Sequence, residues 1–361
     1  MTPWMAGHAR RTSVASVAAS LAIILTLTLA SGAAGASDRA TATAAAPIDA
    51  VGAVGITVGD LDRSVAFYRD VLAFRVVAEE ESSGGSLEQL EGVFGAHVRS
   101  ARLELGREAI VLTQYLAPRG RPVPPDARSN DRSFQHVAIV VADMDRAYAL
   151  LRARGVRHVS TAPQTLPAWN KGAAGIRAFY FADPDDHTLE IIWFPPGKGD
   201  PRWQRPGVPA PAAPLFLGID HTAIAVGDTA RSLRFYRDTL GLRVAGESEN
   251  YGTEQEHLNN VFGAHLRITG LRAQAGPGIE LLEYLTPRDG RPAPPDLHAN
   301  DLAHWQTMLH APDVAATTAH ALGAGAVTTS PAPVDRADPT FAIKRARLLR
   351  DPDGHGLLFG Q

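Results

Sequence analysis

The chain of 361 residues contains no cysteine. This absence excludes disulfides, thiolate nucleophiles and zinc sites built on cysteine. An excess of positive charge is also missing, since the formal net charge is −3, and we therefore expect no nucleic-acid partner. The remaining composition, with 45% hydrophobic and 20% charged residues, is ordinary for a globular protein long enough for two domains.

Long apolar runs are scarce, and the one that stands out lies near the N-terminus. Residues 14–30 are apolar, follow a pair of arginines and precede a stretch of small residues. This order is typical of a secretory signal, and the run is short for a membrane span. We expect residues 1–36 to be a signal peptide and 37–50 a flexible tether. The working protein should then lie outside the cytoplasm, secreted or in the cell envelope, and a membrane anchor that is not cleaved is the alternative.

The second half of the chain repeats the first. The segment "RSVAFYRDVLAFRV" starts at Arg63 and matches "RSLRFYRDTLGLRV", which starts at Arg231. The pairs "VFGAHVR" and "VFGAHLR", and "DPDDH" and "DPDGH", have the same offset of 168 residues. A nearly constant offset indicates a tandem duplication. We predict domains over 51–194 and 216–361, joined by a Pro-rich linker over 195–215 that is too stiff and polar for the core.

Each copy divides once more. Residues 51–118 and 134–194 both have the pattern of a strand, an aspartate suited to cap a helix, the helix, and further strands. A glycine-rich loop is expected around Gly84 and Gly85. The sequence therefore predicts an α+β protein made of four βαβββ modules in tandem.

Two histidines and two glutamates stand at matching places in the two central modules. His136 and His221 lie on the first strands of modules two and three, and Glu190 and Glu280 lie among apolar residues on their last strands. A single strand histidine is more often a core or edge residue than a ligand, and a single strand glutamate usually faces solvent. The joint pattern favours another interpretation, because a buried carboxylate needs a partner. Two imidazoles and two carboxylates suit a divalent metal of intermediate hardness.

These motifs resemble the vicinal oxygen chelate superfamily, which includes glyoxalase I, bleomycin-resistance proteins, methylmalonyl-CoA epimerase and extradiol dioxygenases. The resemblance is carried by "VGDLDRSVAFYRDVLAF", "VGDTARSLRFYRDTLGL", "IELLEY" and "DPDDHTLEII", and it extends from Val51 to the end. It implies that modules pair into curled sheets around a metal, with one ligand from the first strand and one from the last strand of each module. The family positions here are His136, Glu190, His221 and Glu280.

The other two modules have lost this set. The counterparts are Ala53 for His221, Val111 for Glu280, Gln306 for His136 and Leu358 for Glu190. Resemblance to a fused glyoxalase I dimer implies that module two pairs with module three and module one with module four. One site would then be intact and its twin degenerate. Because the duplication mimics a dimer, a monomeric chain is expected.

The resemblance implies one divalent ion (Zn, Ni, Mn or Fe) and a small oxygenated substrate. The expected chemistry is that of an isomerase, epimerase or lyase, with Glu190 or Glu280 moving a proton next to a carbonyl. One alternative is an extradiol ring-cleaving dioxygenase, which uses two histidines and one glutamate on iron. Another is a protein that sequesters a ligand without a metal, as bleomycin-resistance proteins do.

Overall fold

The computed structural model describes residues 48–204 and 214–361. The expected signal peptide and almost all of the tether lie outside the described residues, as does part of the linker. Among the residues it describes, no helix is long and apolar enough to cross a membrane.

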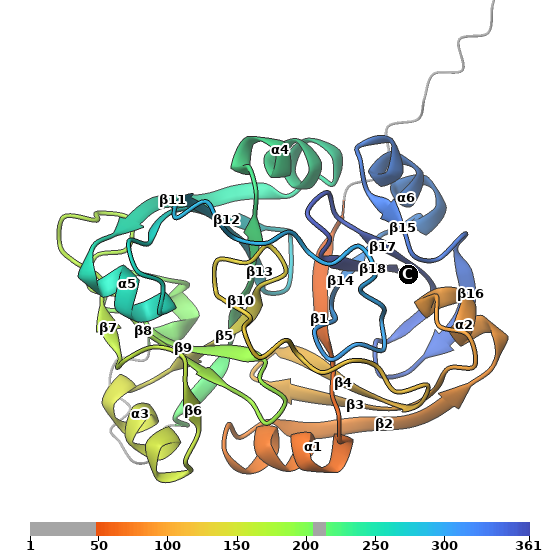
Figure 1. Cartoon of the computed structure of the whole chain (residues 1–361), viewed down its shortest axis with the longest axis horizontal. Coiled ribbons are helices and arrows are strands. Elements are labelled where there is room, and N and C mark those ends of the chain that lie inside the picture. Colours follow the sequence, from red (N-terminus) through yellow and green to blue (C-terminus); the bar gives the residue numbers. More distant parts are fainter. Residues whose placement is uncertain (1–47, 205–213) are drawn as a thin grey trace, which may run out of the picture. The chain divides into compact units, whose positions relative to one another are not determined.

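Four modules follow one another along the chain (Figure 1). Module one consists of β1 (Ala50–Thr57), α1 (Leu61–Asp70), β2 (Arg75–Ser83), α2 (Gly85–Glu91), β3 (His97–Leu105) and β4 (Glu108–Ala117). Module two consists of β5 (Gln135–Val141), α3 (Met144–Ala153), β6 (Arg157–His158), β7 (Gln164–Thr165), β8 (Arg177–Ala182) and β9 (Thr188–Trp193), and the 3-10 turn η1 (Pro201–Trp203) follows it. Module three consists of β10 (Phe216–Val226), α4 (Thr229–Leu233), the π-helical η2 (Arg234–Thr239), β11 (Arg243–Tyr251), α5 (Thr253–Asn259), β12 (His265–Arg272) and β13 (Gly278–Thr286). Module four consists of β14 (Trp305–His310), α6 (Val314–Gly323), β15 (Val327–Thr328), β16 (Val334–Asp338), β17 (Ile343–Arg350) and β18 (Gly356–Gly360).

An aspartate caps the first helix of every module. In each case its side chain accepts a hydrogen bond from the backbone N–H three residues later, as an N-cap should. The four caps are Asp60, Asp143, Asp228 and Asp313. The predicted start of the first helix behind Asp60 is confirmed.

Helices α2 and α5 were not expected from the sequence. The glycine-rich loop predicted around Gly84 and Gly85 is instead the start of α2. Only Gly84 has the positive φ of a loop glycine, and the helix that follows buries Leu87 and Leu90 against the sheet. Seven residues are too few for their helical periodicity to be read from sequence.

Each of the two sheets combines modules from both copies. One sheet has the order β15-β17-β18-β14-β1-β4-β3-β2, and the other has the order β11-β12-β13-β10-β5-β9-β8-β6. The first strands join the halves, since β1 pairs antiparallel with β14 and β10 pairs antiparallel with β5. The predicted pairing of module two with three and of module one with four is therefore confirmed.

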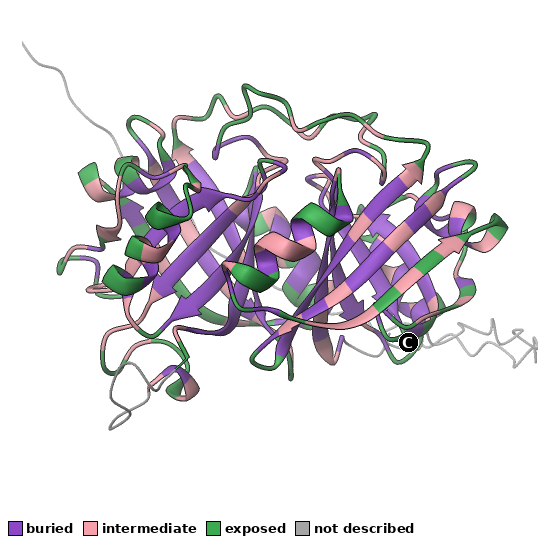
Figure 2. Cartoon of the chain, turned by 90° about the horizontal axis from the view of Figure 1, so that it is seen from below, coloured by how far each residue is buried: buried purple, intermediate pink, exposed green. Residues whose placement is uncertain are grey.

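The helix-facing sides of both sheets share their cores. One core combines α1 and α3 with strands of both sheets, and a second combines η2 and α6 with strands of both sheets. Figure 2 shows strands that are mostly buried and exposed residues concentrated on helices and loops. The other face of each sheet, which is turned away from these helices, packs into buried clusters of its own.

In the described part of the predicted linker, residues 195–204 and 214–215, Trp203 is buried. Trp203 is buried with Ala138, Val140 and Leu217, under the face that carries the candidate site. The prediction that this segment is too stiff and polar for the core is wrong at Trp203. Its indole can be buried because its N–H donates a hydrogen bond of 3.0 Å to Asp220.

Candidate metal centre

The four predicted site residues occupy two adjacent cross-strand rows in the sheet of modules two and three. The first row contains His136, Ala223 and Glu280, and the second contains Glu190, Ala138 and His221. Residues paired in this way point to the same face of a sheet. Strands from both copies thus direct two imidazoles and two carboxylates into one interior.

Three of these residues form a compact buried group. The ligand atoms of His136, Glu190 and His221 all lie within 4.8 Å of one another. Oε2 of Glu190 is 3.1 Å from Nε2 of His136 and 3.6 Å from Nε2 of His221. Glu280 stands just outside this group, although its Oε2 lies 3.5 Å from Nε2 of His221. It is also the most accessible of the four, with 26% of its side chain exposed.

His221 is held from behind by a second carboxylate. Its Nδ1 lies 3.0 Å from Oδ2 of Asp220, and Nη2 of Arg272 donates to the same oxygen over 2.9 Å. The other oxygen of Asp220 accepts the bond from Trp203. A carboxylate on one imidazole nitrogen fixes the ring and leaves the other nitrogen, Nε2, aimed at Glu190 and Glu280.

The charges of this group shift its pKa values. Burial opposes a charge on His221, but Glu280, Asp220 and Glu190 outweigh it and raise the pKa of His221 to about 9. Burial also opposes a charge on Asp220, yet His221, Arg272 and Trp203 hold its pKa well below the ordinary value. For Glu280, burial and the neighbouring Glu190 raise the pKa, although His221 acts against them.

The donor set fits a divalent cation. Nε2 of His221 is buried and forms no hydrogen bond, even though two carboxylates face it. A buried polar atom without a partner is costly, and a cation between these groups would satisfy it. Two imidazoles with one or two carboxylates suit zinc, nickel, manganese or iron.

Aromatic rings cover one side of the group. The ring centroid of His136 lies 4.8 Å from that of Tyr180 and 5.7 Å from that of Phe134. Burial, together with the charges of Glu190 and Glu280, raises the pKa of Tyr180 well above its ordinary value. Its hydroxyl therefore stays neutral, and the rings of Tyr180 and Phe134 form one wall of the site.

The twin position in the other sheet has apolar residues at three of its four places, and the fourth, Gln306, is buried beside Glu91. Ala53, Val111 and Leu358 belong to one buried cluster that also contains Phe341. The row that corresponds to His136, Ala223 and Glu280 consists of Gln306, Gly55 and Val111, and we call it the twin row. A methyl group placed on Gly55 would lie 2.9 Å from Cζ of Phe341. The expected loss of the second site is thus accompanied by a side chain that fills it.

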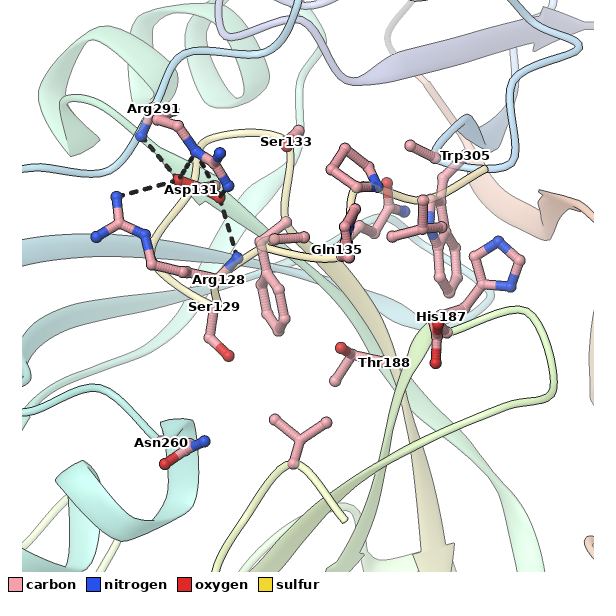
Figure 3. Close-up of a pocket in the computed structure, with 18 of the residues that line it drawn as sticks. Arg128, Ser129, Asp131, Ser133, Gln135, His187, Thr188, Asn260, Arg291 and Trp305 are labelled. Atoms are coloured by element: carbon pink, nitrogen blue, oxygen red, sulfur yellow. Dashed lines mark hydrogen bonds and ion pairs between the residues drawn. The ribbon is translucent and has the colours of Figure 1, made fainter. Parts of the chain in front are cut away.

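A separate cavity of about 580 Å³ lies between the loops 123–135 and 291–305 (Figure 3). Its rim is held by an ion pair of 2.6 Å between Arg291 and Asp131. The described residues that line it include Phe134 but not the four predicted site residues. The cavity is therefore a neighbour of the candidate metal centre, and the ring of Phe134 stands between the two.

Sequence reasoning missed Asp220 and Arg272, although a signal was present. Their counterparts at the same offset of 168 residues are Gly52 and Glu104. Both residues thus differ between the copies in the same way as His221 and Ala53 do. Extending the comparison of copies beyond potential ligands would have identified them.

Comparisons with known proteins identify one family for both copies. The family model of the Glyoxalase/Bleomycin resistance protein/Dioxygenase superfamily matches residues 50–191 and again 218–359. The 2-epi-5-epi-valiolone epimerase of an Actinomyces species is 36% identical over 153 residues, which are 41% of this chain and 81% of that protein. A lactoylglutathione lyase of Arabidopsis thaliana is 26% identical over 192 residues, 53% of this chain and 54% of the lyase. The chain thus spans about half the length of that lyase.

Solved structures show the same fold. Glyoxalase I from Zea mays has a TM-score of 0.53 at 16% identity, with 86% of this chain and 92% of the maize chain covered. A proposed dioxygenase from Bacillus subtilis has a TM-score of 0.52 at 14% identity, with 87% and 85% covered. At such identities the likeness concerns the fold alone.

Proposed function

Because the chain belongs to the glyoxalase/bleomycin resistance protein/dioxygenase superfamily, we propose that it is a metal-dependent enzyme that moves a proton next to a carbonyl of a small oxygenated substrate. The observation that carries the proposal is the buried group of His136, Glu190 and His221 within 4.8 Å. A protein that only sequesters a ligand would not need buried, charged groups that are costly without a cation.

We assign one divalent ion to these three residues, with Glu280 as the fourth ligand. The ion would polarise two substrate oxygens and stabilise the negative charge that develops on them. The chain supplies the remaining functions. Asp220 orients His221, Tyr180 and Phe134 keep water out on one side, and the open side at Glu280 admits the substrate.

Glu190 is the proposed base, and Glu280 is its alternative. Oε2 of Glu190 faces both imidazoles and would hold the ion there, and the same oxygen is the proposed acceptor of the substrate proton. Glu280 has the same relation to His221 but is more exposed. An epimerase requires two groups that exchange a proton with one substrate centre, and Glu190 and Glu280 are the two candidates for that pair.

Epimerisation is the first reaction to test. The epimerase relative has the higher identity of the two described above, and most of its length is matched. The proposed export, which rests on residues 1–36, also disfavours a glutathione adduct as substrate because such adducts are cytoplasmic. Cell fractionation tests the export.

A ring-cleaving dioxygenase is the second candidate. It is favoured by the three-membered group itself, since two histidines and one carboxylate are the ligand set of non-haem iron oxygenases. The closeness of Glu280 to His221 argues for four ligands and against this reading.

The test is proton exchange in D₂O. The metal-loaded protein is incubated with cyclic and acyclic α-hydroxy ketones, and loss of the proton signal next to the carbonyl is followed by NMR. We expect exchange with at least one ketone, and its collapse in Glu190→Gln with the metal still bound. Oxygen consumption with catechols, without exchange in any ketone, would support the dioxygenase instead.

A further inference from the structure

Two glycines continue the row of His136 and Glu280 across the sheet. Gly270 on β12 lies opposite Glu280, and Gly246 on β11 lies opposite Gly270. Directly opposed residues of antiparallel strands point to the same face. Any side chain at these two positions would therefore stand on the face that holds the candidate metal centre.

The space above both glycines is open. A methyl group on Gly246 would meet no atom within 4 Å, and one on Gly270 would meet only the carbonyl oxygen of Gly246, at 3.8 Å. Exposure rises along the row, from His136, which is fully buried, through Glu280 to Gly246, which is exposed. The row thus leads from the candidate metal centre to solvent.

The backbone does not require glycine at either place. Neither residue has the positive φ that favours glycine, so an ordinary side chain would be tolerated. Glycine inside a strand weakens it and often marks a place where a ligand comes close to the backbone. The two glycines therefore call for an explanation outside local conformation.

The twin row has no such opening. The counterparts of Gly246 and Gly270 are Ala78 and Arg102, which occupy the matching register positions. The guanidinium of Arg102 reaches across to the carbonyl oxygen of Thr340 over 3.0 Å. The next residue there is Phe341, whose counterpart beside the intact site is Ala173. The two copies thus differ in how open the row is to solvent, as well as in their potential metal ligands.

We propose that Gly246 and Gly270 form the seat for the part of the substrate that extends beyond the metal, and that this part is a flat six-membered ring. Since neighbouring strands are about 4.8 Å apart, two positions without side chains give a strip about 10 Å wide. The strip is flanked by Ile268 and Ser248, which offer an apolar surface and a hydroxyl. This inference rests on the proposed function, because the ring is anchored by oxygens at the metal.

Oxygen chelators of graded size test the seat. The cobalt-loaded protein is titrated with acetohydroxamate, which carries only a methyl group, and with benzohydroxamate, which carries a six-membered ring. In Gly270→Leu, benzohydroxamate should bind at least about tenfold more weakly than in the parent. Acetohydroxamate binding and cobalt content should stay the same. Gly246→Val should act in the same direction.

Ala78→Leu is the matched control. It enlarges the side chain at the position of the twin row that corresponds to Gly246, and it should change neither titration. Unchanged benzohydroxamate binding in both glycine variants would contradict the proposed role of the two glycines. It would not contradict the proposed metal centre. Equal weakening of both chelators with the cobalt retained would also contradict the role of the two glycines. If acetohydroxamate does not perturb the cobalt spectrum of the parent, the proposed function fails, and the seat fails with it.

Discussion

At the scale of single residues, the copies differ in more than their potential ligands. His221 comes with Asp220 behind it and Arg272 beyond that, whereas the first copy has Ala53 and Gly52 at the two strand positions. A histidine without this support could rotate and lose its aim at Glu190. The candidate metal centre therefore depends on Asp220 and Arg272 as well as on the four potential ligands.

Asp220→Asn tests this support. The amide cannot hold His221 and Arg272 with a negative charge, so the metal dissociation constant should rise by about 10- to 100-fold. Equilibrium dialysis measures the change. Glu104→Gln, at the counterpart of Arg272 in the first copy, is the control and should leave the constant unchanged. An affinity in Asp220→Asn equal to that of the parent would show that His221 needs no support.

Glu91, in the other half, gives stability a dependence on pH. Burial, reinforced by Asp338, raises the pKa of Glu91 from 4.5 to about 7, although Gln306 acts against the shift. A carboxyl with a raised pKa stabilises the fold while protonated, and that contribution is lost as pH rises from about 4.5 to 7. Glu91→Gln should therefore be more stable than the parent by about 3 kcal/mol at pH 8 and no different at pH 4. Urea unfolding at both pH values measures this, and an equal difference at the two would contradict it.

At the scale of elements, the strands that carry the site could be predicted, and their short neighbours could not. The first strands of modules two and three are rich in apolar and β-branched residues, and the duplication aligns the modules. His136, Glu190, His221 and Glu280 could therefore be placed from the sequence. Helices α2 and α5 have only seven residues each, too few for periodicity to show. The burial of Trp203 depends on Asp220, a contact across 17 residues that no local pattern contains.

The loop before β17 has become part of a core. Phe341 is 6% exposed and packs over Gly55, where the other half has its candidate metal centre. Phe341→Ala should lower the free energy of unfolding by about 3–5 kcal/mol, because it leaves a cavity. Metal content should not change. Phe94→Ala, at a side chain that is 91% exposed, should leave stability unchanged. Loss of metal in Phe341→Ala would show that the twin half still takes part in binding.

At the scale of the whole molecule, one chain contains what two subunits would otherwise supply. Both sheets combine strands of the two copies, and both helix cores contain residues of each sheet. This arrangement supports the proposal that the chain is a monomer. It also explains how one site could be lost without loss of the fold, since the twin half remains as a support for the other.

A cleavable linker tests this interleaving. With a protease site placed within residues 205–213, cleavage should leave the two fragments together, because the ladders β5–β10 and β1–β14 join them. Size-exclusion chromatography should show an unchanged elution volume, and the metal should stay bound. Fragments that separate in native buffer would contradict the arrangement.

The most direct test of the account is the number of metal ions per chain. The purified protein is dialysed against each of zinc, nickel, manganese and iron, and bound metal is measured by mass spectrometry. The account predicts one ion per chain, its loss when His136→Ala and His221→Ala are combined, and no loss in Gln306→Ala. Two ions per chain, or undiminished metal in the double variant, would contradict it.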